Sequence, residues 1–146
     1  MKRLEKVAGE TKNLAHAQAE IEDVLQAYES ALNASNTDTA LTVFTPDGVF
    51  MAPNSPSRIG ADAIRAAYKG IFQAITFETE LQVEEIVQVS PNWAFVRTSS
   101  SGFVTVRATG QRVPDANHEL FIFNKGDDHK WRIARYSFST TNPPPG

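Results

Sequence analysis

The chain has 146 residues and a formal charge of −3, and 41% of its residues are hydrophobic. One domain of that length buries a substantial core, and a mildly acidic balance argues against a nucleic-acid or anionic-membrane surface, which needs clustered basic residues. Cysteine is absent, which excludes disulfides and thiolate sites. Because we find no membrane-spanning apolar run and no apolar signal segment, we expect a soluble cytoplasmic protein with no membrane or nucleic-acid partner.

Three helices are predicted in the first half of the chain, after a flexible polar arm over residues 1–13. The first helix begins at Leu14, because apolar residues follow three- and four-residue steps from there to Leu32. A short second helix is expected next, with the side chain of Asn36 or Thr37 as its cap. The third helix carries an apolar stripe as far as Ile75.

Strands dominate the second half of the chain. A turn over 45–48 and a short strand over 49–52 come before the third helix. From residue 78 to residue 139, β-branched and aromatic stretches are separated by turn sequences, and a Pro-rich tail over 141–146 follows. This order predicts an α+β fold, in which three N-terminal helices pack on a strongly curved antiparallel sheet with an open, ligand-binding end.

The sequence signatures of common enzyme classes are missing. There is no Walker loop, no dinucleotide fingerprint, no Gly-x-Ser-x-Gly elbow and no His-Glu-x-x-His. His118 and Glu119 are neighbours in a predicted strand, so their side chains point to opposite faces and cannot bind one ion together. We therefore expect no metal and no cofactor.

Two polar residues on apolar elements are the candidates for function. Tyr28 lies on the buried stripe of the first helix, where it is either a core aromatic or a functional hydroxyl. Glu119 shares its strand face with Phe121, and a carboxylate on an apolar face is paired, protonated or functional. A salt bridge from Glu119 to Arg97 or Arg135, both on neighbouring predicted strands, is the structural alternative, and an outward contact with solvent is the alternative for either arginine.

Several sequence motifs in a fixed order carry a family resemblance. They are Ala27-Tyr28, the segment from Asn36 to Leu41, the segment from Phe44 to Phe50, the segment from Ile59 to Ile64, and the segment from Trp131 to Tyr136. With these motifs the chain resembles the NTF2-like superfamily, in its SnoaL-like and ketosteroid-isomerase-like branch, over residues 14–140. The fold hosts isomerases, dehydratases and non-catalytic modules alike, so the resemblance implies the fold more firmly than the activity.

The resemblance implies roles for individual residues. Tyr28 matches the oxyanion-hole tyrosine of ketosteroid isomerases, and Glu119 matches their protonated carboxylic acid. The general base of that family should stand just before Pro53, where this chain has Ala52, which cannot accept a proton. Any enzyme here needs another base, for which Glu119 and His118 are the candidates.

Two functional hypotheses follow. The first is an isomerase or tailoring-type enzyme that binds a small apolar, carbonyl-bearing or polyketide-like molecule. Its pocket would be lined by Phe50, Ala52, Phe72, Arg97, His118, Phe121, Arg135 and Phe138. The second is a non-catalytic binding module that forms a homodimer through the outer face of the sheet, with Trp93, Phe95, Phe103 and Val104 as that face.

Overall fold

The computed structural model describes residues 2–143, and it describes side chains from residue 15 onward. Three helices lie in this part of the chain: α1 (Lys2–Asn33), α2 (Thr37–Thr42) and α3 (Ala61–Ala74). Helix α1 begins well before Leu14, so the backbone over 2–13 is helical where we expected a loose arm. Of the predicted Pro-rich tail, residues 144–146 lie outside the described residues.

A single six-stranded sheet holds the rest of the chain, in the order β2-β1-β6-β5-β4-β3. Its strands are β1 (Phe44–Met51), β2 (Arg58–Ile59), β3 (Ile75–Ser90), β4 (Trp93–Val106), β5 (Arg112–Lys125) and β6 (Trp131–Thr140). Neighbouring strands are antiparallel, except that β1 and β6 run parallel. The prediction of an α+β fold with a curved, mainly antiparallel sheet is confirmed.

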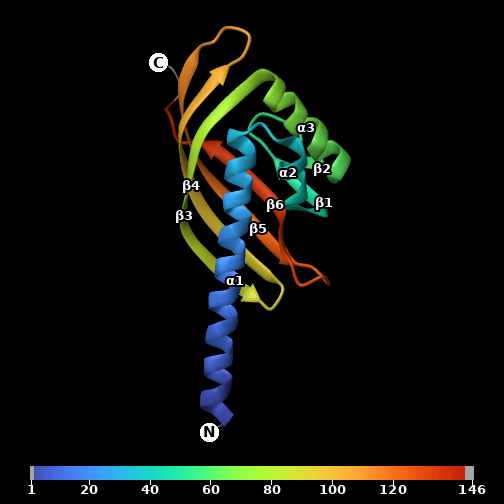
Figure 1. Ribbon diagram of the computed structural model, residues 1–146, viewed down its shortest axis with the longest axis vertical. Coiled ribbons are helices and arrows are strands. Elements are labelled where there is room, and N and C mark those ends of the chain that lie inside the picture. The colour runs from blue at the N-terminus through green and yellow to red at the C-terminus, as the bar shows by residue number, and fades with distance from the viewer. Residues whose placement is uncertain (1, 144–146) are drawn as a thin grey trace.

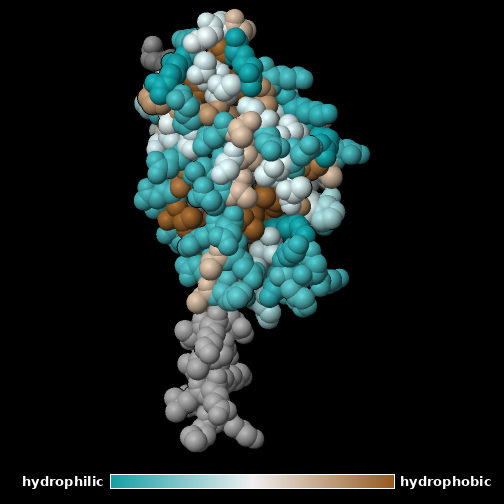
Figure 2. Space-filling model, in the orientation of Figure 1, coloured by the Kyte–Doolittle hydropathy of each residue, from teal (hydrophilic) through white to brown (hydrophobic). Residues whose placement is uncertain are grey.

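The helices cover one side of this sheet. Figure 1 shows α1 lying along the curved sheet, with α2, α3 and the β1–β2 pair grouped beside the C-terminal half of α1. On that side of the molecule the surface is mostly hydrophilic, and hydrophobic patches flank α1 (Figure 2). No helix among residues 2–143 is long and apolar enough to cross a membrane.

Two details of the prediction need correction. The expected turn over 45–48 lies inside β1, where the register with β6 shifts between Phe44 and Val49. Pro46 is accommodated because the irregular part of the strand needs no ladder hydrogen bond from it. The third helix, α3, follows β1 and β2, so the helices are not all N-terminal to the sheet.

Alternation along β4 and β5 assigns residues to the two faces of the sheet. Thr98 pairs with Glu119 on the inner, helix-covered face, and Phe95 pairs with Ile122 on the outer face. Of the four residues expected on the outer face, Val104 instead lines the interior cavity. The ring of Phe103 is covered by the guanidinium of Arg112, 3.5 Å from the ring centroid.

An aromatic cluster joins the helices to the inner face. Tyr28 of α1 makes edge-to-face contacts with Tyr68 of α3 and with Phe121 and Tyr136 of the sheet. Phe121 and Tyr136 stack with their centroids 4.2 Å apart. All four rings are at most 4% exposed, and each buried ring of this size contributes about 1.5–3 kcal/mol to stability. Three of these rings, Tyr28, Tyr68 and Tyr136, also line the cavity described next.

Candidate ligand-binding site

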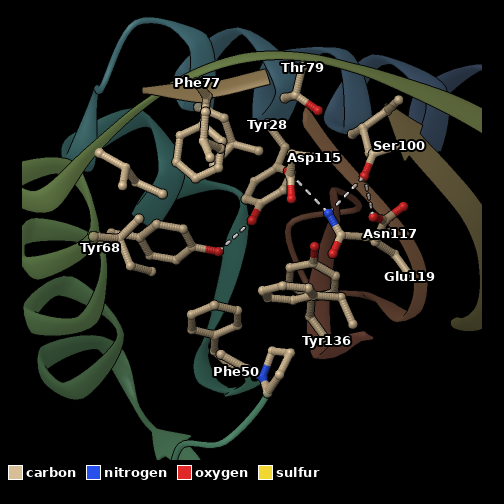
Figure 3. A pocket seen from close by; sticks show the side chains of 18 residues that line it. Tyr28, Phe50, Tyr68, Phe77, Thr79, Ser100, Asp115, Asn117, Glu119 and Tyr136 are labelled. Atoms are coloured by element: carbon tan, nitrogen blue, oxygen red, sulfur yellow. Dashed lines mark hydrogen bonds between the residues drawn. The ribbon is translucent and has the colours of Figure 1, made fainter. Parts of the chain in front are cut away.

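A cavity of about 360 Å³ lies between α1, α3 and the inner face of the sheet. Most of its lining is apolar, from residues such as Leu32, Phe50, Ile71, Phe77, Leu81 and Phe138. Its polar groups come from Tyr28, Tyr68, Thr79, Ser100, Asp115, Asn117, Glu119 and Tyr136 (Figure 3). A largely apolar cavity with a few convergent polar groups is typical of small-molecule sites.

Glu119 is the most buried acid of the cavity, with only 5% of its surface exposed. Thr98 donates its hydroxyl to Oε1 of Glu119, and Ser100 donates to Oε2, each across 2.6 Å. Burial raises the pKa of the Glu119 carboxyl, and the two hydroxyl donors only partly oppose that rise. The neutral acid is therefore favoured over a wider pH range than in an ordinary glutamate, and a neutral acid can donate a hydrogen bond to a ligand.

Glu119 pairs with neither arginine that we considered. Arg97 lies on the outer face, where its Nη2 is 2.8 Å from Oε2 of Glu85. Arg135 donates through Nη1 to the backbone carbonyl oxygens of Asp47 and Ala134. The alternation of the strands places both side chains on the opposite side of the sheet from the cavity, so the expected ligand contacts from these arginines are corrected.

His118 also points away from the cavity. It is exposed, and its Nε2 lies 2.7 Å from Oγ of Ser139. The strand parity that we assigned to His118 and Glu119 is the one observed, and it removes His118 as a base for the cavity. Among the described residues, no group of three or more His, Cys, Asp or Glu could hold a metal ion.

The apolar residues expected in the pocket fall into two groups. Phe50, Ala52 and Phe138 line the cavity. Phe72 and Phe121 belong instead to the packed core behind the lining, with 6% and 0% of their surfaces exposed. These two are corrected from ligand contacts to supports of the residues that line the cavity.

Three tyrosines, from α1, α3 and β6, line the cavity. The hydroxyl oxygens of Tyr28 and Tyr68 are 2.6 Å apart, and Tyr136 packs its ring against Tyr28. Burial raises the pKa of all three phenols, so they stay protonated at physiological pH. We had singled out only Tyr28, although Tyr68 lies on the apolar stripe of the third helix and Tyr136 in a motif already noted.

Asp115 is a second carboxylate of the cavity that sequence reasoning missed. It is half-buried and lines the cavity together with Asn117, whose Nδ2 donates to Oδ2 of Asp115 across 3.2 Å. Positions 115, 117 and 119 alternate along β5 and therefore share the inner face. Extending the parity of Glu119 back by four residues would have found Asp115.

Comparisons with known proteins agree with this architecture. A family model described as a SnoaL-like domain matches residues 24–135. A ketosteroid isomerase-like protein from Erwinia carotovora atroseptica is 36% identical, with 86% of this chain and 96% of that chain covered and a TM-score of 0.82. A conserved protein from Planctomyces limnophilus is 25% identical, with 86% and 98% covered and a TM-score of 0.76.

More distant structures show the fold alone. An NTF2-like superfamily protein from Salmonella enterica is 17% identical, with 90% of this chain and 96% of that chain covered and a TM-score of 0.78. Among curated proteins, none matches this chain. The resemblance drawn from the sequence motifs is confirmed: the chain has the fold of the NTF2-like protein, and it belongs to the SnoaL-like family.

Proposed function

We propose that the protein binds a small, mainly apolar molecule that carries a carbonyl group, and that it catalyses proton transfer at the carbon beside that carbonyl. The observation that carries this proposal is Glu119, a buried carboxylic acid with a raised pKa that lines an apolar cavity. In the neutral form it donates a hydrogen bond to the carbonyl oxygen, and it stabilises the negative charge that develops there when the neighbouring carbon loses a proton.

The charges around the cavity support a ligand without negative charge. Among the described residues that line the cavity, Asp115 and Glu119 are the two acids, and there is no lysine or arginine. A carboxylate or phosphate ligand would lie in a desolvated space beside Asp115 with no cation to pair with. A ketone avoids this cost and still accepts from Glu119.

The similarity to a ketosteroid isomerase-like protein supports the same class of reaction. However, Ala52 stands where that resemblance implies the base, and its side chain cannot take a proton. Proton transfer by this chain therefore depends on a different arrangement of bases.

The experiment uses 2-tetralone, a small apolar ketone, and 2-naphthoate, an anion with a similar fused-ring framework. Calorimetry should show that 2-tetralone binds at least about tenfold more tightly than 2-naphthoate, a difference of about 1.4 kcal/mol. In D₂O, the protein should accelerate hydrogen–deuterium exchange at the carbon beside the ketone, followed by NMR.

The matched variants are Glu119→Gln and, as a control, Glu22→Gln on the exposed side of α1. Gln keeps an N–H donor at this position but cannot give up a proton to the carbonyl oxygen, so E119Q should lose part of the about 10²–10³-fold contribution of an oxyanion donor, and E22Q should keep the wild-type rate. Tighter binding of 2-naphthoate than of 2-tetralone, or equal exchange rates in E119Q and E22Q, would contradict the proposal.

The outer face of the sheet supports a second proposal, that the protein forms a homodimer. An outer-face patch consists of Val87, Trp93, Phe95, Leu120 and Ile122. Trp93 and Leu120 are 43% and 47% exposed, which is unusual for large apolar side chains gathered on one surface. Pairing two such faces would remove this apolar area from water.

A further inference from the structure

We propose that Asp115 is the proton acceptor of the cavity and that Glu119 is the proton donor. The two carboxyl groups would serve one ligand, with the carbonyl oxygen at Glu119 and the acidic C–H group at Asp115. This inference rests on the proposed function, since it concerns the same cavity, and it supplies the base that Ala52 does not.

Asp115 and Glu119 share one cavity and one strand. Asp115 lines the same cavity as Glu119, from the same face of β5, and it is only half-buried. Figure 3 shows Asp115, Asn117 and Glu119 on one side of the cavity, with Tyr68 on the other side. A ligand in this space meets both acids without any rearrangement of the strand.

A chain of hydrogen bonds sets the spacing of the two acids. Nδ2 of Asn117 donates to Oδ2 of Asp115 across 3.2 Å and to Oγ of Ser100 across 3.4 Å. Ser100 in turn donates to Oε2 of Glu119 across 2.6 Å. The oxygens Oδ2 and Oε2 can be no farther apart than these three distances added together. This limit keeps the two acids close enough to contact the carbonyl oxygen and the neighbouring C–H group of one ligand.

Opposite roles for the two acids follow from their surroundings. The buried Glu119 has its pKa raised mainly by desolvation, and the nearby Asp115 adds to that rise by like-charge repulsion. Asp115 is more exposed, and its carboxylate accepts the amide hydrogen of Asn117. Two neighbouring acids in unequal environments commonly divide into a donor and an acceptor of protons.

The other titratable groups near the cavity do not qualify as the base. Burial keeps Tyr28, Tyr68 and Tyr136 protonated, because it raises the pKa of each phenol. His118 is on the outer face, and its nearest polar partner is Ser139. Among the described lining residues, Asp115 is left as the group able to accept a proton from carbon.

The proposed step balances without a further reactant. Asp115 takes the proton from the carbon next to the carbonyl, and the C–H electron pair becomes the double bond of an enol or enolate. The carbonyl π electrons move to oxygen, which receives a hydrogen bond or a proton from Glu119. Return of the proton to the same carbon gives isotope exchange, and its return to a conjugated carbon gives isomerisation. No oxidant or reductant takes part.

The test compares Asp115→Asn with Asp127→Asn, an exposed turn residue mutated in the same way. Exchange of 2-tetralone in D₂O is followed by NMR, and its binding is measured by calorimetry. A general base contributes about 10²–10⁴-fold, so D115N should exchange at least about 100-fold more slowly than D127N. Binding should change by less than about threefold, because one polar group is replaced by another of the same shape.

The outcomes separate this inference from the proposed function. If D115N and D127N exchange equally fast, Asp115 is not the base, whatever E119Q does. If the wild-type protein binds 2-tetralone but does not accelerate its exchange, the inference is overturned and ligand binding stands. If the wild-type protein does not bind 2-tetralone, the proposed function fails and this inference falls with it. Thermal unfolding of D115N near that of wild type excludes misfolding as the cause of a slow rate.

Discussion

Ser100 in β4 donates its hydroxyl to Oε2 of Glu119 in β5, across 2.6 Å between two neighbouring strands. Thr98 completes the arrangement at Oε1. Two hydroxyl groups therefore satisfy a buried carboxyl group that an arginine would otherwise hold as an ion pair. A carboxyl partnered in this way keeps access to its neutral form, which is the property that the proposed chemistry needs.

The raised pKa of Glu119 predicts a specific dependence of stability on pH. The folded protein holds the Glu119 proton to a higher pH than the unfolded chain, whose glutamates titrate near about 4.3. The stability contributed by this proton is thus complete below about 4.3 and is lost as the pH rises through the folded-state pKa.

Glu119→Gln should remove this loss. We expect the free energy of unfolding of E119Q to increase relative to that of wild type as the pH rises from about 4 to 8, because wild type loses stability over this range and the variant does not. Urea unfolding at several pH values measures the difference, and E22Q is the control. A difference that is constant with pH would show that Glu119 has an ordinary pKa in the folded protein.

The tyrosine pair predicts a coupled effect on stability. The hydroxyls of Tyr28 and Tyr68 are buried and 2.6 Å apart, so removing one leaves the other without this partner. Tyr28→Phe should therefore lower the free energy of unfolding by about 1–3 kcal/mol. The double variant Y28F/Y68F should lose less than the two single losses combined. Strictly additive losses in urea unfolding would argue against the hydrogen bond.

Sequence patterns predicted the fold well because they are local. Apolar residues recur every three or four positions in a helix and alternate in a strand, and both patterns can be followed along the chain. The strand period of β4, from Trp93 to Val106, is such a case. Of the two predicted caps of α2, Asn36 is the one observed, and it accepts from the backbone N–H of Thr39. The bulged start of β1 was mistaken for a turn, since Pro46 and Gly48 favour turns in most contexts. The segment lies within the strand because the residues on either side of it, Phe44 and Val49, pair with the distant β6.

The site was less predictable than the fold. The inward orientation of Glu119 followed from its parity with Phe121, and that local pattern is correct. Its actual partners, Thr98 and Ser100, depend on the register between β4 and β5, which no local pattern fixes. The same parity placed His118 outside, whereas Arg97 and Arg135 were placed only on neighbouring strands, and of their two predicted alternatives the outward one is observed.

Position 52 offers a gain-of-function prediction. Ala52 lines the cavity at the place where the family resemblance implies a base. Adding Ala52→Asp to D115N should restore exchange of 2-tetralone by at least about tenfold, within the about 10²–10⁴-fold range of a general base. The matched control, A52N/D115N, should restore nothing. Equal rates in these two double variants would show that position 52 does not reach the ligand carbon.

The outer-face patch predicts the effect of a charge on oligomeric state. Leu120→Glu adds a carboxylate to the outer-face patch, opposite Arg97, which already pairs with Glu85, and burial of this extra charge would disfavour dimer formation. We expect wild type to have the mass of a dimer in light scattering and L120E that of a monomer. Ile59→Glu, at a residue that is 70% exposed on β2, should remain a dimer. A monomeric wild type would contradict the dimer proposal.

Titration of the Glu119 carboxyl group tests its role as the proton donor most directly. In a ¹³C-labelled protein, the carboxyl carbon of Glu119 is assigned by its absence in E119Q and followed by NMR from about pH 4 to 8, a range that extends above the ordinary value. We predict a midpoint above that ordinary value, and a further rise when 2-tetralone binds, because a ligand that accepts a hydrogen bond from the acid stabilises the neutral form. A midpoint at or below the ordinary value, unmoved by 2-tetralone, would contradict the central claim that Glu119 is the proton donor of the cavity.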